Sequence, residues 1–148
     1  MKPKICIVQA NYYPDISLHL YNGAQQILKD HGFPPIATAY PKRLKIIPGV
    51  FEIPITIAKY INSYDAFIAL GCIIKGETPH FDLISNAVTN GIMDLSITHK
   101  KPIGNGIIAC FNKEQAIKRA FNTKKNNKGG EAAKAVLSVL GILKNESK

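Results

Sequence analysis

Apolar and polar residues alternate along the chain in blocks that predict strands followed by helices. Two apolar runs, at 5–10 and 66–74, have the length of strands that are buried on both faces. Residues 102–110 predict another strand, although Gly104 and Gly106 loosen its start. Elsewhere the apolar residues recur every three or four positions, which is typical of amphipathic helices. These predicted helices are 16–28, 52–61, 81–95, 112–121 and 131–143.

This order of elements predicts an α/β protein. Strands that alternate with helices form a parallel sheet through right-handed crossovers, with helices on both faces. We therefore expect a three-layer α/β/α arrangement with a four-stranded parallel sheet, flavodoxin-like, in a single domain over residues 1–148. The remaining strand is the least defined, because the candidate at 36–40 is followed by Pro41 and three basic residues. The first few residues, residues 123–128 and residues 144–148 are the candidates for disorder.

Charge and hydropathy bound the class of partner. The formal net charge is +9, with some excess of basic residues between 113 and 128. Such a charge fits nucleic acid, a membrane surface or anionic substrates. The sequence contains no arginine-rich run and no basic stretch interleaved with stacking aromatics, so we expect a phosphorylated metabolite and no nucleic acid. It contains no apolar run of membrane-span length, so we expect no membrane partner and a cytoplasmic location.

The three cysteines, Cys6, Cys72 and Cys110, lie inside apolar runs. Their odd number argues against a disulfide framework, and no two of them have metal-ligand spacing. We therefore expect buried, reduced thiols and no metal site.

The segment 71–82 contains the most informative pattern. A buried strand ends there, Gly76 allows a tight turn, and Thr78 and Pro79 suit the start of the next helix. Free N–H groups at a helix N-terminus bind anions, and His80 places an imidazole beside them. The helix terminus disfavours a charged imidazole and a bound phosphate favours it. By spacing alone, a purely structural turn is equally compatible with the pattern.

Two further segments have a structural and a functional interpretation. Pro48-Gly49 followed by Val50, Phe51 and Glu52 is typical of a helix start, where Glu52 complements the helix dipole. A carboxylate is also a good acceptor for polyol hydroxyls. An aromatic directly after the first strand can stack on a planar heterocycle. Both Tyr12 and Tyr13 have that position, and alignment through Ile16 favours Tyr12.

These motifs resemble lumazine synthase, the enzyme that forms 6,7-dimethyl-8-ribityllumazine. Residues 71–82 are similar to its strand-to-helix turn, residues 48–54 to its Pro-Gly-Ala-x-Glu-Ile/Leu-Pro motif, and residues 114–120 with 127–129 to its phosphate-binding part. The resemblance covers nearly the whole chain. It implies that His80 transfers protons. It also implies substrate contacts from Tyr12, Val50, Phe51, Glu52, Cys72, Ile73, Ile74, Glu77, Thr78, Asn105, Arg119 and Lys128.

The chain departs from the family pattern at a few positions. Tyr12 replaces a phenylalanine or tryptophan, and Asn105 replaces the phenylalanine that many members insert into a neighbouring subunit's pocket. The segment between Arg119 and Lys128 is about one residue longer than a common family form, and Phe121 replaces a glycine. Lys124 or Lys125 is therefore an alternative to Lys128 as the lysine that meets the phosphate.

The resemblance implies an enzyme of riboflavin biosynthesis. It would condense 5-amino-6-(D-ribitylamino)uracil with L-3,4-dihydroxy-2-butanone 4-phosphate, without metal or cofactor. It also implies a homo-oligomer with sites between subunits. Because the chain begins close to its first strand, we expect a free pentamer rather than a shell of sixty. Two rival functions are a non-catalytic flavin- or lumazine-binding family member and, from charge alone, a nucleic-acid binder.

Overall fold

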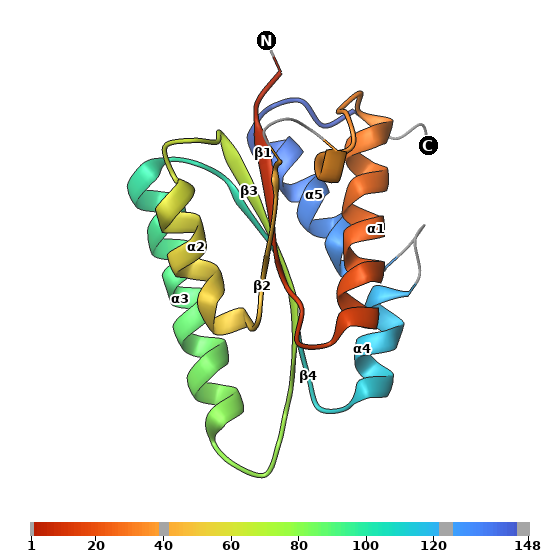
Figure 1. Ribbon diagram of the computed structural model, residues 1–148, viewed down its shortest axis with the longest axis vertical. Helices are drawn as coiled ribbons and strands as arrows, with labels where there is room; N and C mark the ends of the chain where they lie inside the picture. The colour runs from red at the N-terminus through yellow and green to blue at the C-terminus, as the bar shows by residue number, and fades with distance from the viewer. Residues whose placement is uncertain (1, 39–41, 122–125, 145–148) are drawn as a thin grey trace.

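The sheet of this protein is four-stranded and parallel throughout. The computed structural model describes residues 2–38, 42–121 and 126–144. The strands are β1 (Ile5–Ala10), β2 (Leu44–Ile47), β3 (Ala66–Ile74) and β4 (Ile103–Cys110). They pair in the order β2-β1-β3-β4 (Figure 1). The predicted four-stranded parallel sheet is thereby confirmed.

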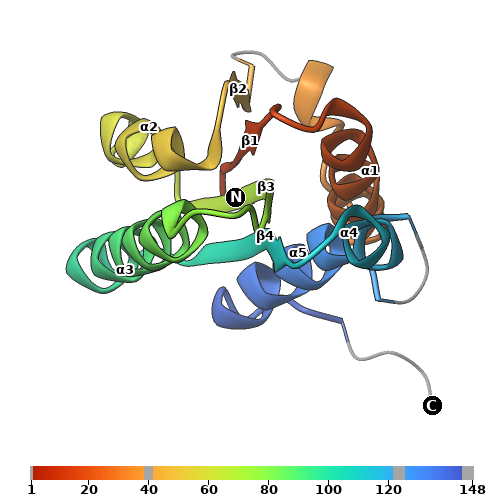
Figure 2. The ribbon, with the colours of Figure 1, turned by 90° about the horizontal axis from the view of Figure 1, so that it is seen from below.

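Helices cover both faces of the sheet. They are α1 (Pro14–Asp30), α2 (Ile53–Tyr60), α3 (His80–His99), α4 (Lys113–Ala120) and α5 (Lys128–Val139), with 3₁₀ turns η1 (Ile36–Thr38) and η2 (Val50–Glu52). Viewed along the strands, α2 and α3 lie on one side of the sheet and α1, α4 and α5 on the other (Figure 2). This arrangement is the predicted three-layer α/β/α fold. None of the described helices is long and apolar enough to cross a membrane.

Each face of the sheet has its own hydrophobic core. Ile7, Ile68 and Ile108 pack under α1 and α5, whereas Val8 and Phe67 pack under α2 and α3. Successive residues of a strand point to opposite faces, so burial on both faces makes every strand position apolar. Removing each such side chain from water contributes about 1.5–3 kcal/mol. This explains why β1 and β3 can be recognised in the sequence as apolar runs.

The strand predicted at 36–40 is wrong in position. Residues 36–38 form the 3₁₀ turn η1, residues 39–41 lie outside the described part of the chain, and β2 follows at Leu44–Ile47. Polar side chains of α1 satisfy the turn. Gln25 accepts a hydrogen bond from the N–H of Ile36 at 2.9 Å, and Tyr21 accepts one from the N–H of Ala37 at 3.2 Å. These long-range partners replace the ladder hydrogen bonds that a strand would need.

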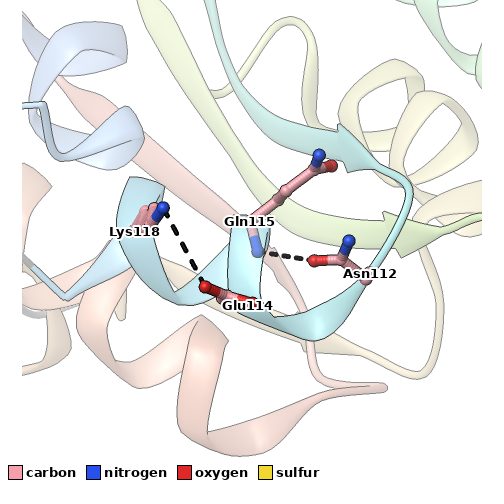
Figure 3. A network of polar contacts seen from close by, with 4 residues as sticks. All are labelled: Asn112, Glu114, Gln115 and Lys118. Atoms are coloured by element: carbon pink, nitrogen blue, oxygen red, sulfur yellow. Dashed lines mark hydrogen bonds and ion pairs between the residues drawn. The ribbon is translucent and has the colours of Figure 1, made fainter.

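The helix boundaries differ from prediction by a few residues. Pro79 is the N-cap of α3 rather than its first residue. Asn112 caps α4 by accepting from the N–H of Gln115 at 2.9 Å (Figure 3). The Gln115 side chain accepts from the N–H of Phe111 at 2.8 Å. Helix α5 begins at Lys128, so the prediction of disorder at 126–128 is wrong; residues 123–125 and 145–148 lie outside the described ranges.

Glycines at the start of β4 make room for α5. A Cβ atom on Gly104 would lie 2.4 Å from the carbonyl oxygen of Ala132. One on Gly106 would lie 2.8 Å from the carbonyl oxygen of Ala69 in β3 and 3.3 Å from the Cβ atom of Ala132 in α5. No side chain fits at either distance. The two glycines therefore bring α5 close to the edge strand, and they do not loosen β4 as its sequence suggests.

The parallel strands bring part of the predicted site together at one edge of the sheet. The turns that leave β1, β3 and β4 all lie at the same end of the molecule, beside η2 (Figure 1). In open α/β sheets this carboxyl edge is where ligands bind.

Candidate active site

A cavity of about 450 Å³ opens at the carboxyl edge of the sheet. This volume is in the range of small-molecule sites. Most of the predicted substrate-binding residues line it, together with His80. The lining residues are Tyr12, Tyr13, Gly49, Val50, Phe51, Glu52, Cys72, Ile73, Ile74, His80 and Ile84.

Two adjacent tyrosines form one wall of the cavity. Tyr12 is exposed, whereas Tyr13 is half-buried at the N-cap of α1. Their ring centroids lie 4.9 Å apart at an interplanar angle of 74°, an edge-to-face contact. Burial raises the pKa of the Tyr13 phenol, and the neighbouring Cys72 and Cys110 add to this effect. Tyr12 thus offers a ring face to a ligand, while Tyr13 supports that ring and keeps its hydroxyl protonated.

The turn before α2 supplies a second wall. The Glu52 Oε1 atom accepts a hydrogen bond from the N–H of Gly49 at 3.1 Å, and the N–H of Glu52 donates to the carbonyl oxygen of Gly49 at 3.2 Å. The Thr56 hydroxyl donates to the carbonyl oxygen of Glu52 at 2.7 Å and joins η2 to α2. Phe51 is 58% exposed. The sequence folds this way because Gly49 is extended and Pro54 suits the first turn of α2.

The floor of the cavity is the end of β3. Pairing with β4 continues past Ile74, since the Lys75 N–H donates to the carbonyl oxygen of Cys110 at 2.9 Å. Cys6, Cys72 and Cys110 are buried and free, as predicted. Burial raises the pKa of the Cys72 thiol to about 12, with Cys110 as a further cause. A thiol with such a pKa is protonated at neutral pH and is a poor nucleophile.

His80 lies at the N-terminus of α3, directly above this floor. Its backbone N–H lies 3.4 Å from the Thr78 Oγ1 atom, a long hydrogen bond. Gly76, Glu77 and Thr78 are exposed, and a Cβ atom on Gly76 would meet nothing within 4 Å. Glu77 and Thr78 thus lie on the turn rather than among the lining residues. An anion can approach the backbone of this turn freely, beside the imidazole.

Arg119 and Lys128 lie in a second cavity, of about 510 Å³, on the outer side of β4. Ile107, Ile108, Ala109, Asn126 and Glu131 also line it. The Arg119 guanidinium donates to the carbonyl oxygen of Ala109 at 3.3 Å, which directs it along the strand end. Among the described residues, the two cavities have no lining residue in common. Lys124 and Lys125, the predicted alternatives, lie outside the described ranges.

Asn105 lies on the exposed edge of β4, outside both cavities. Its Oδ1 atom accepts a hydrogen bond from the N–H of Ile107 at 3.0 Å. An edge strand has unpaired N–H groups, and this contact satisfies one of them. In the single chain, the Asn105 side chain therefore makes its hydrogen bond within its own strand, β4.

Sequence reasoning missed several lining residues. Ile84 lies one helical turn after His80, so its i+4 spacing was the available signal. Glu131 places a carboxylate in the cavity of Arg119 and Lys128, and Asn126 adopts a left-handed backbone there, with φ of 62°. The sequence has no local pattern that identifies these two as lining residues. Within the described ranges, no cluster of three or more histidine, cysteine or acidic side chains is placed to hold a metal ion.

The fold and the site define a class: a flavodoxin-like α/β protein with a ligand site at the carboxyl edge of its sheet. Comparison with known proteins gives the family. Residues 2–144 match the family model of 6,7-dimethyl-8-ribityllumazine synthase. The chain therefore belongs to the lumazine synthase family and is a transferase of riboflavin biosynthesis.

Curated relatives with the same name cover almost the whole chain. The 6,7-dimethyl-8-ribityllumazine synthase of Buchnera aphidicola subsp. Baizongia pistaciae is 46% identical over 96% of this chain and 88% of its own length. That of Agrobacterium fabrum is 39% identical over 97% of this chain and 96% of its own length. That of Methylorubrum populi is 38% identical over 94% of this chain and 82% of its own length. These matches do not favour a non-catalytic binding protein.

Proposed function

We propose that the chain condenses 5-amino-6-(D-ribitylamino)uracil with L-3,4-dihydroxy-2-butanone 4-phosphate in an active site that two copies of the chain form together. One observation carries this proposal. His80 and the aromatic wall line one cavity, and Arg119 and Lys128 line another on the outer side of β4. A second copy that presents its Arg119 cavity to the His80 cavity of the first would complete the site.

The surface of α2 and α3 supports an oligomer. All 20 residues of α3 are described, and among them Val88 and Ile92 are buried. Large apolar side chains are exposed on the same two helices, namely Ile55, Leu83, Met93 and Ile97. An apolar surface of this kind is typical of a subunit interface. We propose a homopentamer, and the number five rests on the family resemblance.

Phe51 connects this surface with the site. It lines the His80 cavity and also a hollow of about 420 Å³ between α2 and α3, which includes Pro54, Ile55 and Val88. A subunit that covers the α2–α3 surface would therefore reach the rim of the active site. This continuity supports an active site between subunits.

The pyrimidine substrate fits the His80 cavity. Its ring would stack on the exposed face of Tyr12. The backbone of Val50 and Phe51 and the Glu52 carboxylate would bind the ribityl chain, because a carboxylate accepts hydrogen bonds from several hydroxyl groups at once. The end of β3 at Cys72–Ile74 would support the ring through backbone groups.

The phosphate would bind between the turn at Gly76–Thr78 and the cations of the neighbouring copy. The 5-amino group would then attack the ketone carbon, and loss of water would form a Schiff base. Elimination of phosphate and ring closure would follow. His80 would move the protons of these steps as general acid and base. Holding two substrates in contact supplies most of the acceleration.

Two finer statements belong to the same proposal. The described elements form one sheet between two helical layers, which supports a single lumazine synthase-like domain over residues 1–148. Three free, buried cysteines fit the reducing cytoplasm, where we place the enzyme.

Turnover of both substrates is the direct test. Purified protein is incubated with the ribitylaminouracil and the butanone phosphate, and lumazine absorbance is followed. We expect product and stoichiometric phosphate. Binding of lumazine without turnover would instead support a non-catalytic role.

A further inference from the structure

Arg119 and Lys128 come from different helices but line one cavity. Arg119 lies in the last turn of α4, and Lys128 is the first residue of α5. Two cations can bind one phosphate only if their separation is fixed. The question is which contact fixes it.

Asn127 joins the ends of the two helices. Its side chain is 4% exposed. The Nδ2 group donates to the carbonyl oxygen of Ala120 at 2.7 Å and to that of His19 at 3.0 Å. The Oδ1 atom accepts from the N–H of Gly130 at 3.0 Å and caps α5. A single buried amide thus connects the residue after Arg119 with the helix that begins at Lys128.

The same part of α1 holds the segment from both sides. The Phe121 ring stacks on the His19 ring, with centroids 3.8 Å apart and an interplanar angle of 27°. His19 therefore contacts Phe121 through its ring and Asn127 through its carbonyl oxygen. The two ends of the connection between α4 and α5 rest on one residue of α1.

Close packing of α5 on α1 keeps Asn127 in place. A Cβ atom on Gly129 would lie 2.1 Å from the carbonyl oxygen of Leu20, and one on Gly23 would lie 2.1 Å from the Asn127 Oδ1 atom. The glycines leave the space that the amide occupies. The amide cannot shift without moving α1 or α5.

We propose that Asn127 is a positioning residue, which fixes the separation of Arg119 and Lys128 independently of the length of the segment 122–125. This proposal rests on the proposed phosphate role of the two cations. The described side-chain contacts of Asn127 are to His19, Ala120 and Gly130, which lie outside residues 122–125.

The test distinguishes the role of the Asn127 amide from that of the segment 122–125. One variant inserts a glycine between Asn122 and Thr123, which keeps Lys124 and Lys125 adjacent, and the other is Asn127→Ser, which keeps a helix cap but loses both donated hydrogen bonds. KM for each substrate and kcat are measured. We expect the insertion to change KM for the butanone phosphate by less than about 2-fold, and Asn127→Ser to raise it by about 10-fold with KM for the pyrimidine unchanged.

A matched control uses the other asparagine cap. Asn112→Ser makes the same change at the start of α4, where the described side-chain contact is to Gln115 of the same helix. We expect its KM values to stay near wild type. If the glycine insertion alone raises KM for the butanone phosphate by about 10-fold, the segment sets the separation and the proposal is wrong. This outcome remains decisive if Asn127→Ser fails to fold.

Arg119→Ala separates failure of this inference from failure of the proposed function. A selective increase in KM for the butanone phosphate supports the phosphate role. If Arg119→Ala has that effect and Asn127→Ser does not, the positioning role alone is wrong. If Arg119→Ala affects both substrates equally, the phosphate role is wrong, and the inference that depends on it is wrong as well.

Discussion

The Glu52 carboxylate accepts a hydrogen bond from the N–H of Gly49, with 3.1 Å between the two atoms. Glu52 therefore shapes the turn that forms one wall of the active site, in addition to its proposed contact with the ribityl chain. The two roles differ in what they require. A capping acceptor can be neutral, whereas strong binding of several hydroxyls benefits from charge.

Substitution at Glu52 separates these roles. Glu52→Gln keeps an acceptor for Gly49, so we expect stability within about 0.5 kcal/mol of wild type and a KM for the pyrimidine about 3- to 10-fold higher. Glu52→Ala removes the cap as well, and we expect about 1 kcal/mol lower stability. Urea denaturation and steady-state kinetics give the two quantities. Wild-type KM in Glu52→Gln would show that the carboxylate serves the turn alone.

Removal of the imidazole tests the proton-transfer role. In His80→Ala we expect kcat to fall by about 10²-fold or somewhat less, because a positioned acid–base group contributes about 10²–10⁴ while proximity is retained. The His80 side chain is exposed, so folding should be unaffected. Turnover at the wild-type rate, measured by lumazine absorbance, would remove His80 from the mechanism.

The tyrosine pair gives a prediction about stacking. Tyr12→Ala should weaken binding of the pyrimidine, whereas Tyr12→Phe and Tyr12→Trp should be nearly neutral, because the ring face makes the contact. Fluorescence titration with lumazine measures this. Tyr13→Ala is the comparison: its ring supports Tyr12 edge-on, so we expect a smaller loss of affinity and lower stability. A larger loss of affinity in Tyr13→Ala would assign the stacking role to Tyr13.

The buried cysteines predict a pH dependence of stability. Burial raises the pKa of Cys6 to about 12, and burial followed by Cys110 does the same for Cys72. The unfolded thiols ionise near their ordinary value of 9.0. The folded state thus holds protons that the unfolded state releases, and stability should fall as the pH rises from about 9 to about 12.

Replacement of both thiols isolates that effect. Urea denaturation between pH 8 and 11 is compared for wild type and for the variant with Cys6→Ala and Cys72→Ala. Besides burial, Cys72 and Cys6 help to raise the pKa of Tyr13 and Tyr64, so their removal weakens the tyrosine contribution in the same direction. The slope of the free energy of unfolding against pH should therefore be less negative in the variant. Equal slopes would show that these thiols are not the cause.

The sequence predicts most of the fold. Of the site, it predicts most residues of the His80 cavity but not the separate cavity of Arg119 and Lys128. Runs such as 66–74 are legible because burial on both faces makes each position apolar. His80 and Glu52 can be identified as candidate site residues because each lies in a local turn motif. The strand predicted at 36–40 is wrong in position, since side chains of α1 that lie 11 and 16 residues away accept hydrogen bonds from the backbone of η1. The prediction of disorder at Asn127 is wrong because its side chain bonds to His19, which lies 108 residues away and outside any local pattern.

The separation of the site into two cavities could not be predicted from motifs alone. The predicted phosphate roles of residues 114–120 and 71–82 suggest that the two segments lie together. In the folded chain, Arg119 faces the outer side of β4 and His80 faces the end of β3. This relation depends on the strand order, which places β4 at the edge of the sheet.

The assembly has a direct mass prediction. A pentamer of 16.2 kDa chains has a mass of about 81 kDa. Light scattering on the active enzyme measures it. A monomeric mass with full activity would contradict a shared active site, whereas a mass near that of sixty chains would change the size of the assembly and leave the shared site intact.

Complementation between two defective variants tests the shared active site most directly. His80→Ala and Arg119→Ala are dissociated, mixed in equal amounts, reassembled and assayed at limiting butanone phosphate. If neighbouring copies supply the two residues, about a quarter of the interfaces combine an intact His80 with an intact Arg119. We predict activity well above that of either variant reassembled alone. Activity no higher than the average of the two would contradict the account, because it would place both residues in a site formed by one chain.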